Sequence, residues 1–374
     1  MNTMLISAKY ICPLRGLATL EPPEPIRLGQ AARVAGNLGV KRLMLPVLEE
    51  PLMGAGKATI NYLDGLLQAL DQVGEAGLTA WLIAPARRVL GLDWVPPYLV
   101  KGGRDPEAGL VFLEGRLRNV WPYNWWEDIS VLQKRIKAFR ELVNAVSGHP
   151  ALTGWVIMDR SLEWARPEPE VAELMLKSYT AEIREKDESG TIYLGLSWSE
   201  LLDPEMARSL ANQMDGLFMS GLENPPFKSN GSEGLVGELR IATYLGLLIQ
   251  WLFGQSTEVE VGWGMIERMG DPEEILETFK RSARQGLTGL NWLSLIDPEP
   301  KLRSHPPWVL RTNLDRAGLL NRGVEPKEHV EIWLKEILSA TPKDGISDFI
   351  DISVEEYLAN PHTHFHRLWD HFLE

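Results

Sequence analysis

The stretch PEEILETFKRSARQ at residues 272–285 is followed by LTGLNWLSL at 287–295. The first segment is typical of an amphipathic helix, and the second is a short apolar segment typical of a buried strand. The same pair stands directly before it, with a helix predicted at Gly237–Phe253 and a strand at Glu258–Val261. A strand that alternates with a helix in this way indicates an α/β architecture with a parallel sheet.

Going outward from this stretch, the alternation extends to the start of the chain. Residues 61–76 place leucines and a valine on one helix face, and Gly77 ends the helix before the next apolar strand. The predicted strands are Leu5–Ile11, Val40–Val47, Leu78–Ala84, a strand within 149–159, Ile192–Trp198, Gly216–Ser220, Glu258–Val261 and Leu287–Leu295. The predicted helices between them are Leu28–Leu38, Asn61–Ala76, Ile129–Val146, Val171–Glu185, Pro204–Gln213, Gly237–Phe253 and Pro272–Gln285.

Eight strand–helix alternations predict an α/β fold of the (β/α)₈ (TIM) barrel type with a C-terminal helical tail. We expect the barrel at residues 1–338 and a C-terminal extension at 339–374. Gly91–Asn124 is predicted as one long loop. A doubly wound sheet is less favoured, because no GxGxxG turn follows the first strand.

Composition narrows the classes of function. The formal net charge is −13 and no basic stripe occurs, so a nucleic-acid partner is not expected. The single cysteine, Cys12, excludes an intramolecular disulfide and a thiolate metal centre, and we expect it to be a buried small side chain. We expect no signal peptide, no membrane span, no metal and no cofactor, and therefore a cytoplasmic protein. The apolar segment Ile241–Phe253 is predicted to be a buried helix.

Four motifs occur in order along nearly the whole chain: GVKRLMLPV at 39–47, HPALTGWVIMDR at 149–160, EVEVGWG at 258–264 and GLTGLNWLSLIDP at 286–298, the last followed by GLLNRGVEPKEHV. Together they resemble the clan A glycoside hydrolases of the cellulase and mannanase type. The resemblance implies a retaining glycosidase, which needs two carboxyl groups about 5 Å apart on the fourth and seventh strands. It places the nucleophile at Glu260 and the tryptophan below the bound sugar at Trp292, beside Asn291.

The other half of the catalytic pair departs from the pattern. The family's Asn–Glu pair falls on Asp159 and Arg160, and arginine cannot act as a general acid because it stays protonated. Asp159 is the first candidate for the acid/base, with Glu163 and Glu223 as alternatives from loops. The family's second-strand arginine is Met44 here, and the expected third-strand histidine and sixth-strand His and Tyr are also absent.

Aromatic side chains supply candidates for sugar binding, since the C–H face of a pyranose packs well on an aromatic ring. Besides Trp292, the substrate-binding candidates are Trp263, Trp126 with its neighbours Trp121 and Trp125, Asn291, Arg160 and Glu223. The HxHxH tract in the tail, at 362–366, would align its histidines for a metal only if extended, and a helix surface is favoured instead. Phe365–Phe372 is predicted as an amphipathic helix that docks on the barrel or on a protein partner.

Two hypotheses follow. In the first, the chain is a carbohydrate-active enzyme, a hydrolase or transglycosylase with Glu260 as nucleophile and an altered acid/base. In the second, it is a pseudoenzyme, a glycosidase-like barrel that serves as a sugar-binding or protein-assembly module. A second carboxylate close to Glu260 would favour the enzyme, and a mouth filled by Arg160, Met44 or loop side chains would favour the pseudoenzyme.

Overall fold

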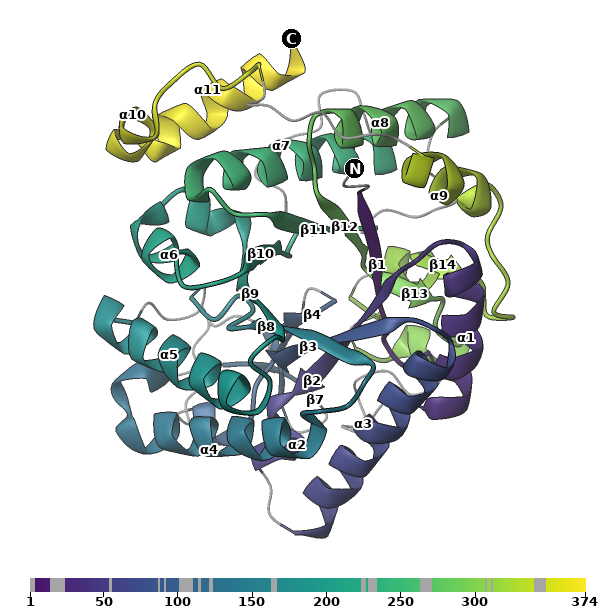
Figure 1. Cartoon of the computed structure of the whole chain (residues 1–374), viewed down its shortest axis with the longest axis vertical. Helices are drawn as coiled ribbons and strands as arrows, with labels where there is room; N and C mark the ends of the chain where they lie inside the picture. Colours follow the sequence, from purple (N-terminus) through teal and green to yellow (C-terminus); the bar gives the residue numbers. More distant parts are fainter. Residues whose placement is uncertain are drawn as a thin grey trace.

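The computed structural model describes residues 4–13, 24–53, 56–86, 88–90, 92–100, 110–113, 116–120, 124–162, 167–222, 227, 234–262, 271–306, 308–310, 312–339 and 348–374. Eight parallel strands close into a barrel in the order β1-β12-β11-β10-β9-β8-β3-β2 (Figure 1). The strands are β1 (Leu5–Lys9), β2 (Arg42–Leu48), β3 (Thr79–Ala86), β8 (Leu152–Ile157), β9 (Thr191–Leu196), β10 (Gly216–Met219), β11 (Thr257–Val261) and β12 (Gly289–Trp292). The predicted fold class is therefore confirmed.

Helices connect successive strands and surround the barrel, as Figure 1 shows. They are α1 (Pro25–Asn37), α2 (Glu49–Met53), α3 (Lys57–Glu75), α4 (Ile129–Val146), α5 (Pro169–Lys186), α6 (Pro204–Ala211), α7 (Leu235–Phe253) and α8 (Pro272–Arg284), with α9 (Val330–Ser339) after the last barrel strand. Local sequence fixes where several of them begin. The carboxylate of Asp128 caps α4 by accepting from the backbone N–H groups of Ser130 and Val131, and Asp271 caps α8 in the same way.

The segment between β3 and α4 is more ordered than predicted. Where one long loop was expected, a small four-stranded sheet forms from β4 (Arg88–Val89), β5 (Leu92–Trp94), β6 (Leu110–Leu113) and β7 (Arg116–Asn119). The β6–β7 pair is antiparallel, while β5 pairs with β6 in parallel. Such short strands have too few residues for an alternating apolar pattern, so they could not be predicted from the sequence.

The C-terminal segment adds two helices, α10 (Val354–Ala359) and α11 (Pro361–Leu373), which pack on the outside of the barrel beside α7 (Figure 1). The Tyr244 hydroxyl of α7 donates to the backbone carbonyl of Phe365, and the rings of Phe365, Trp369 and Phe372 surround Tyr244. The predicted amphipathic helix thus exists, and its apolar face contacts the barrel. Among the described residues, α7 alone has the length and apolar composition of a membrane-crossing helix. In this helix, 78% of an 18-residue apolar stretch is buried inside the molecule.

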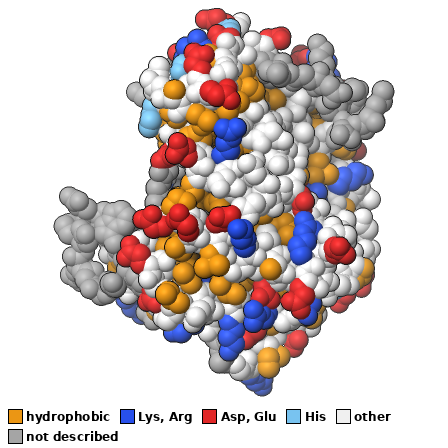
Figure 2. Space-filling model, turned by 60° about the vertical axis from the view of Figure 1, so that its left-hand side comes forward, with side chains coloured by type: hydrophobic (Ala, Val, Ile, Leu, Met, Phe, Trp, Pro, Cys, Tyr) orange, Lys and Arg blue, Asp and Glu red, His pale blue; other side chains and the backbone are white. Residues whose placement is uncertain are grey.

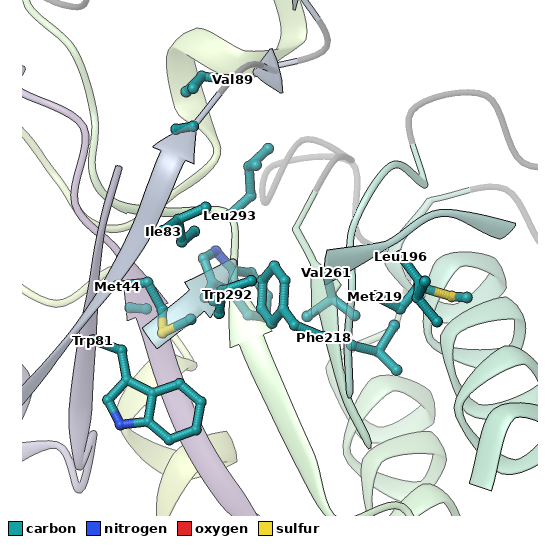
Figure 3. Close-up of a cluster of buried hydrophobic side chains, with 14 of the residues drawn as sticks. Met44, Trp81, Ile83, Val89, Leu196, Phe218, Met219, Val261, Trp292 and Leu293 are labelled. Carbon is teal, nitrogen blue, oxygen red and sulfur yellow. The ribbon is translucent and has the colours of Figure 1, made fainter. Parts of the chain in front are cut away.

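The barrel interior is filled by side chains, as is usual for this architecture. Figure 3 shows part of this buried cluster, with Met44, Trp81, Phe218 and Trp292 among its labelled members. Cys12 is buried, as predicted. On the face drawn in Figure 2, acidic and basic side chains are interspersed.

Candidate active site at the carboxyl end of the barrel

The strand register decides which side chains share the barrel interior. Parallel register partners project to the same face, and residues two apart on one strand do so as well. Glu260 of β11 pairs with Asn291 of β12, and Asn291 pairs with Ser7 of β1. Glu258 lies two residues before Glu260 on β11, toward the amino end of the strand. The interior therefore carries two successive polar layers.

The layer nearer the carboxyl ends of the strands holds the predicted nucleophile. The Glu260 carboxylate forms an ion pair with the ammonium group of Lys9, the last residue of β1. The Asn291 side-chain amide lies 3.5 Å from Glu260 Oε2, and the Ser7 hydroxyl donates to Asn291 Oδ1 at 3.1 Å. Glu260 and Lys9 are only 1% and 2% exposed. A buried cation in direct contact with a carboxylate stabilises the ionised form of that carboxylate.

The layer below holds a second ion pair, between the buried Glu258 and the half-buried Arg42. Arg42 Nη1 of β2 lies 2.6 Å from Glu258 Oε1, and the Arg42 guanidinium stacks 3.4 Å from the ring centroid of Trp81. Burial, together with the nearby Glu258 charge, raises the pKa of Tyr193. The Ser7 hydroxyl lies 3.4 Å from Glu258 Oε2 and so touches both layers. These contacts fix β11 in the barrel below Glu260.

The second predicted carboxylate, Asp159, follows the end of β8 and is also buried. Its Oδ1 atom accepts a hydrogen bond from the Ser220 hydroxyl at 3.0 Å. Ser220 follows β10, where Met219 pairs with Val259, so Ser220 stands next to Glu260 in the register. Asp159 is thus joined through a hydroxyl to the strand beside the one that carries Glu260.

Arg160, at the position of the family's acid/base glutamate, adopts a positive φ of 51°. A non-glycine residue rarely adopts this left-handed conformation, and Met158, two residues earlier, shares it with a φ of 54°. The Arg160 guanidinium lies against Gly221, where there is no room for a β-carbon. The chain therefore turns sharply after β8, and the buried arginine is held close to the loop that follows β10.

Trp292 is buried at the end of β12, and its indole N–H donates to the backbone carbonyl of Ala317 at 2.8 Å. Its edge lies against Gly262, directly after β11. The Glu238 carboxylate, in the first turn of α7, accepts from the Gly262 backbone N–H at 2.5 Å. Trp292 and Glu238 together hold the end of β11, two residues beyond Glu260.

The remaining predicted residues are placed as follows. Trp126 is buried and stacks on Trp125, with ring centroids 3.8 Å apart, and Trp125 in turn packs against the Arg135 guanidinium. Its role as a sugar contact stays a prediction. Glu223, Trp263, Glu163 and Trp121 lie outside the described residues. The described residues include no group of three histidine, cysteine or acidic side chains arranged to hold a metal ion.

Sequence reasoning missed Lys9, although a signal was present. Lys9 is the one charged residue of the apolar strand LISAK, and it is followed by the apolar Tyr10 and Ile11. A lysine in a buried strand needs an acidic partner. That partner, Glu260, is distant in sequence, and closure of the barrel through β12 brings it close.

Comparison with known proteins supports the fold. No family model matches the sequence, and no curated protein matches it significantly. Among solved structures, a GH5_18 protein from Streptomyces cattleya in complex with GlcNAc superposes with a TM-score of 0.71 at 13% identity, covering 91% of this chain and 82% of that one. A GH5_18 protein from Bifidobacterium longum subsp. infantis gives 0.69 at 16% identity, with coverages of 93% and 81%.

The exo-beta-1,4-mannosidase Op5Man5 from Opitutaceae bacterium strain TAV5 gives a TM-score of 0.67 at 15% identity, covering 90% of this chain and 60% of that one. At these identities the likeness concerns the fold. The chain has the same barrel fold as these glycoside hydrolase structures, which is the fold that the sequence motifs predicted.

Proposed function

We propose that this chain is a carbohydrate-active enzyme of the retaining glycosidase type, with Glu260 as nucleophile. The observation that carries the proposal is the ion-paired carboxylate of Glu260, buried near the carboxyl end of β11. Active sites of such barrels lie at this end, and the fold does not by itself carry function, so the argument rests on these side chains.

The arrangement supports the chemistry as follows. A Glu260 carboxylate oxygen would form a bond to the anomeric carbon while the bond to the leaving oxygen breaks. A nucleophile must be ionised to attack, and the Lys9 ammonium favours that state. Asp159 would protonate the leaving oxygen, with the Ser220 hydroxyl orienting its carboxyl group. The Arg160 guanidinium stays protonated and cannot act as the general acid.

The fold neighbours suggest which sugars to test first. One GH5_18 protein from Streptomyces cattleya is described in complex with Manb1-4GlcNAc, and Op5Man5 is described as an exo-beta-1,4-mannosidase. We therefore infer that a β-mannoside is the first substrate class to try with this chain. The GlcNAc complex adds N-acetylglucosaminides to the panel.

The test uses dinitrophenyl 2-deoxy-2-fluoro-β-mannoside, with the β-glucoside and β-galactoside as comparisons, followed by intact-protein mass. The leaving group departs with its electron pair and needs no proton, so the altered acid/base does not limit the reaction. We expect one glycosyl adduct on the native chain and on Asp159→Asn, and none on Glu260→Gln. If no sugar labels the native chain, the retaining-glycosidase proposal is wrong.

The second candidate function is a catalytically inactive sugar-binding barrel. It is favoured by Arg160 at the acid/base position and by the deep burial of Glu260. Calorimetric titration with mannose and β-1,4-mannobiose separates the two functions. Binding without any adduct, unchanged in Asp159→Asn, supports the binding protein.

A further inference from the structure

Lys9 and Met44 occupy equivalent positions on neighbouring strands. They are register partners in the parallel pair of β1 and β2, so their side chains project to the same face of the barrel. Both side chains are buried, and Met44 belongs to the interior cluster of Figure 3. The motif resemblance places an arginine at the position of Met44, so this chain lacks a cation where one is expected.

A cation is present on the neighbouring strand β1. The Lys9 ammonium reaches Glu260 across β12, because β12 is the neighbour of both β1 and β11. It also lies 5.9 Å from the ring centroid of Phe218, so an aromatic face borders the ion pair. Removing one partner of a buried pair leaves an uncompensated charge, which is strongly unfavourable. The Lys9 side chain therefore has little freedom to leave Glu260.

Other charged and polar groups lie around this pair, and they include the buried Arg160 guanidinium, which lies against Gly221 directly after Ser220. Arg42 on β2 pairs with Glu258 in the layer below. Asp159 after β8 accepts from Ser220, which stands beside Glu260 in the register. Asn291 on β12 is neutral and contacts Glu260 through its amide. The Lys9 ammonium group pairs with the Glu260 carboxylate directly.

We propose that Lys9 is the positioning residue of the nucleophile Glu260. This inference rests on the proposed function, since it assigns Lys9 a part in the same reaction. Lys9 acts through Glu260: it keeps the carboxylate ionised and holds it toward the mouth of the barrel.

The test is a charge relocation, read as the pH dependence of adduct formation with the fluoro-mannoside. The variants are Lys9→Met, Lys9→Arg and the double variant Lys9→Met with Met44→Arg. Lys9→Met should slow adduct formation about 100-fold, because the nucleophile loses its fixed geometry. The acid limb of the pH–rate profile of Lys9→Met should move to higher pH by about one to three pH units, because the carboxylate loses its neighbouring cation.

The double variant places an arginine in the register position next to Lys9. It should recover at least about tenfold of the lost rate, and its acid limb should return toward that of the native chain. Lys9→Arg keeps the charge on β1 and should retain the native limb. A Lys9→Met variant that is folded, as circular dichroism shows, and that keeps the native limb would overturn the proposal.

A second measurement does not depend on turnover. If Lys9 holds Glu260 ionised, the free energy of unfolding of Lys9→Met in urea should fall as the pH rises. The reason is that Glu260 then ionises without its partner. Adding Glu260→Gln should abolish that loss. If the two substitutions act independently, the positioning role is wrong even when the native chain forms an adduct. If the pair is coupled but the native chain forms no adduct, the proposed function fails, and the role of Lys9 in it fails too.

Discussion

Gly195 on β9 leaves the space that Asp159 occupies. A β-carbon at Gly195 would lie 2.5 Å from the Asp159 α-carbon and 2.9 Å from its Oδ1 atom. Neither contact is tolerable, and the first involves backbone, which cannot rotate away. The smallest residue on β9 therefore sets where the second carboxylate stands, and Ser220 then orients it.

We expect Gly195→Ala to lower the free energy of unfolding by about 1–3 kcal/mol, because the site is overpacked and the Asp159 backbone must move. Urea unfolding measures the loss. The matched control is Gly36→Ala in α1, where the nearest side-chain atom is 3.4 Å away and alanine favours the helix by up to about 1 kcal/mol. Equal stability of the two variants would contradict this account of Asp159.

Among the elements, an ion pair with a buried carboxylate joins the short strand after the barrel to the segment that follows it. β13 (Ser294–Ile296) and β14 (Gly318–Leu320) form a two-stranded parallel sheet. The Asp297 carboxylate, directly after β13, accepts from the Gly318 backbone N–H at 2.9 Å and from Lys327 Nζ at 2.8 Å. The aspartate of one sequence motif and the lysine of the next thus form one contact.

Burial raises the pKa of Asp297, and the Lys327 ammonium opposes that rise. Because the pKa is higher in the folded state, the stability from this group is present below its unfolded value of about 3.9 and is lost as the pH rises through the folded pKa. Lys327→Met removes the opposing cause. We expect it to cost little near pH 3 and about 3 kcal/mol near pH 7.

Urea unfolding at several pH values between 3 and 7 checks this dependence. The control is Lys177→Met, which breaks an exposed pair with Glu173 and should cost less than about 1 kcal/mol. A Lys327→Met cost that is the same at pH 3 and pH 7 would show that Asp297 does not titrate with its partner.

Helices and strands were predicted best where a periodic pattern of apolar residues continues over many residues. Ile129–Val146 was predicted as a helix and forms α4 with the same bounds, since its apolar residues follow one face over several turns. The eight barrel strands were found because each is a short segment between helices, apolar in most cases and alternating glutamate with valine in β11. The sheet β4–β7 was missed, because its strands span only two to four residues, which is too short for an alternating apolar pattern to show.

For the whole molecule, the order of elements was enough to predict a closed barrel, because strand–helix alternation leaves few other topologies. The candidate site was predicted only in part from the sequence. Motif positions pointed to Glu260 and Asp159, and both are buried at the carboxyl ends of their strands. Lys9 could not be paired with Glu260 from sequence, since their contact depends on barrel closure between β1 and β12.

The C-terminal tail is joined to the barrel by an aromatic cluster around Tyr244. The Trp369 ring of α11 stacks on Phe227 with centroids 4.3 Å apart and meets Tyr244 edge-on at 5.2 Å. Phe227 belongs to the segment between β10 and α7, which leaves the barrel at its carboxyl end. The tail thus packs on a connection that starts at the same end of the barrel as Glu260.

We expect Trp369→Ala to lower the free energy of unfolding by about 3 kcal/mol, because a buried indole leaves a cavity between Tyr244 and Phe227. The control Asp370→Ala changes the next, exposed residue of the same helix and should stay within about 0.5 kcal/mol of the native chain. Urea unfolding followed by tryptophan fluorescence measures both variants. If Trp369→Ala matches Asp370→Ala, the tail adds no stability to the barrel. If it shows the expected loss with one cooperative transition, the tail unfolds together with the barrel and belongs to the same folding unit.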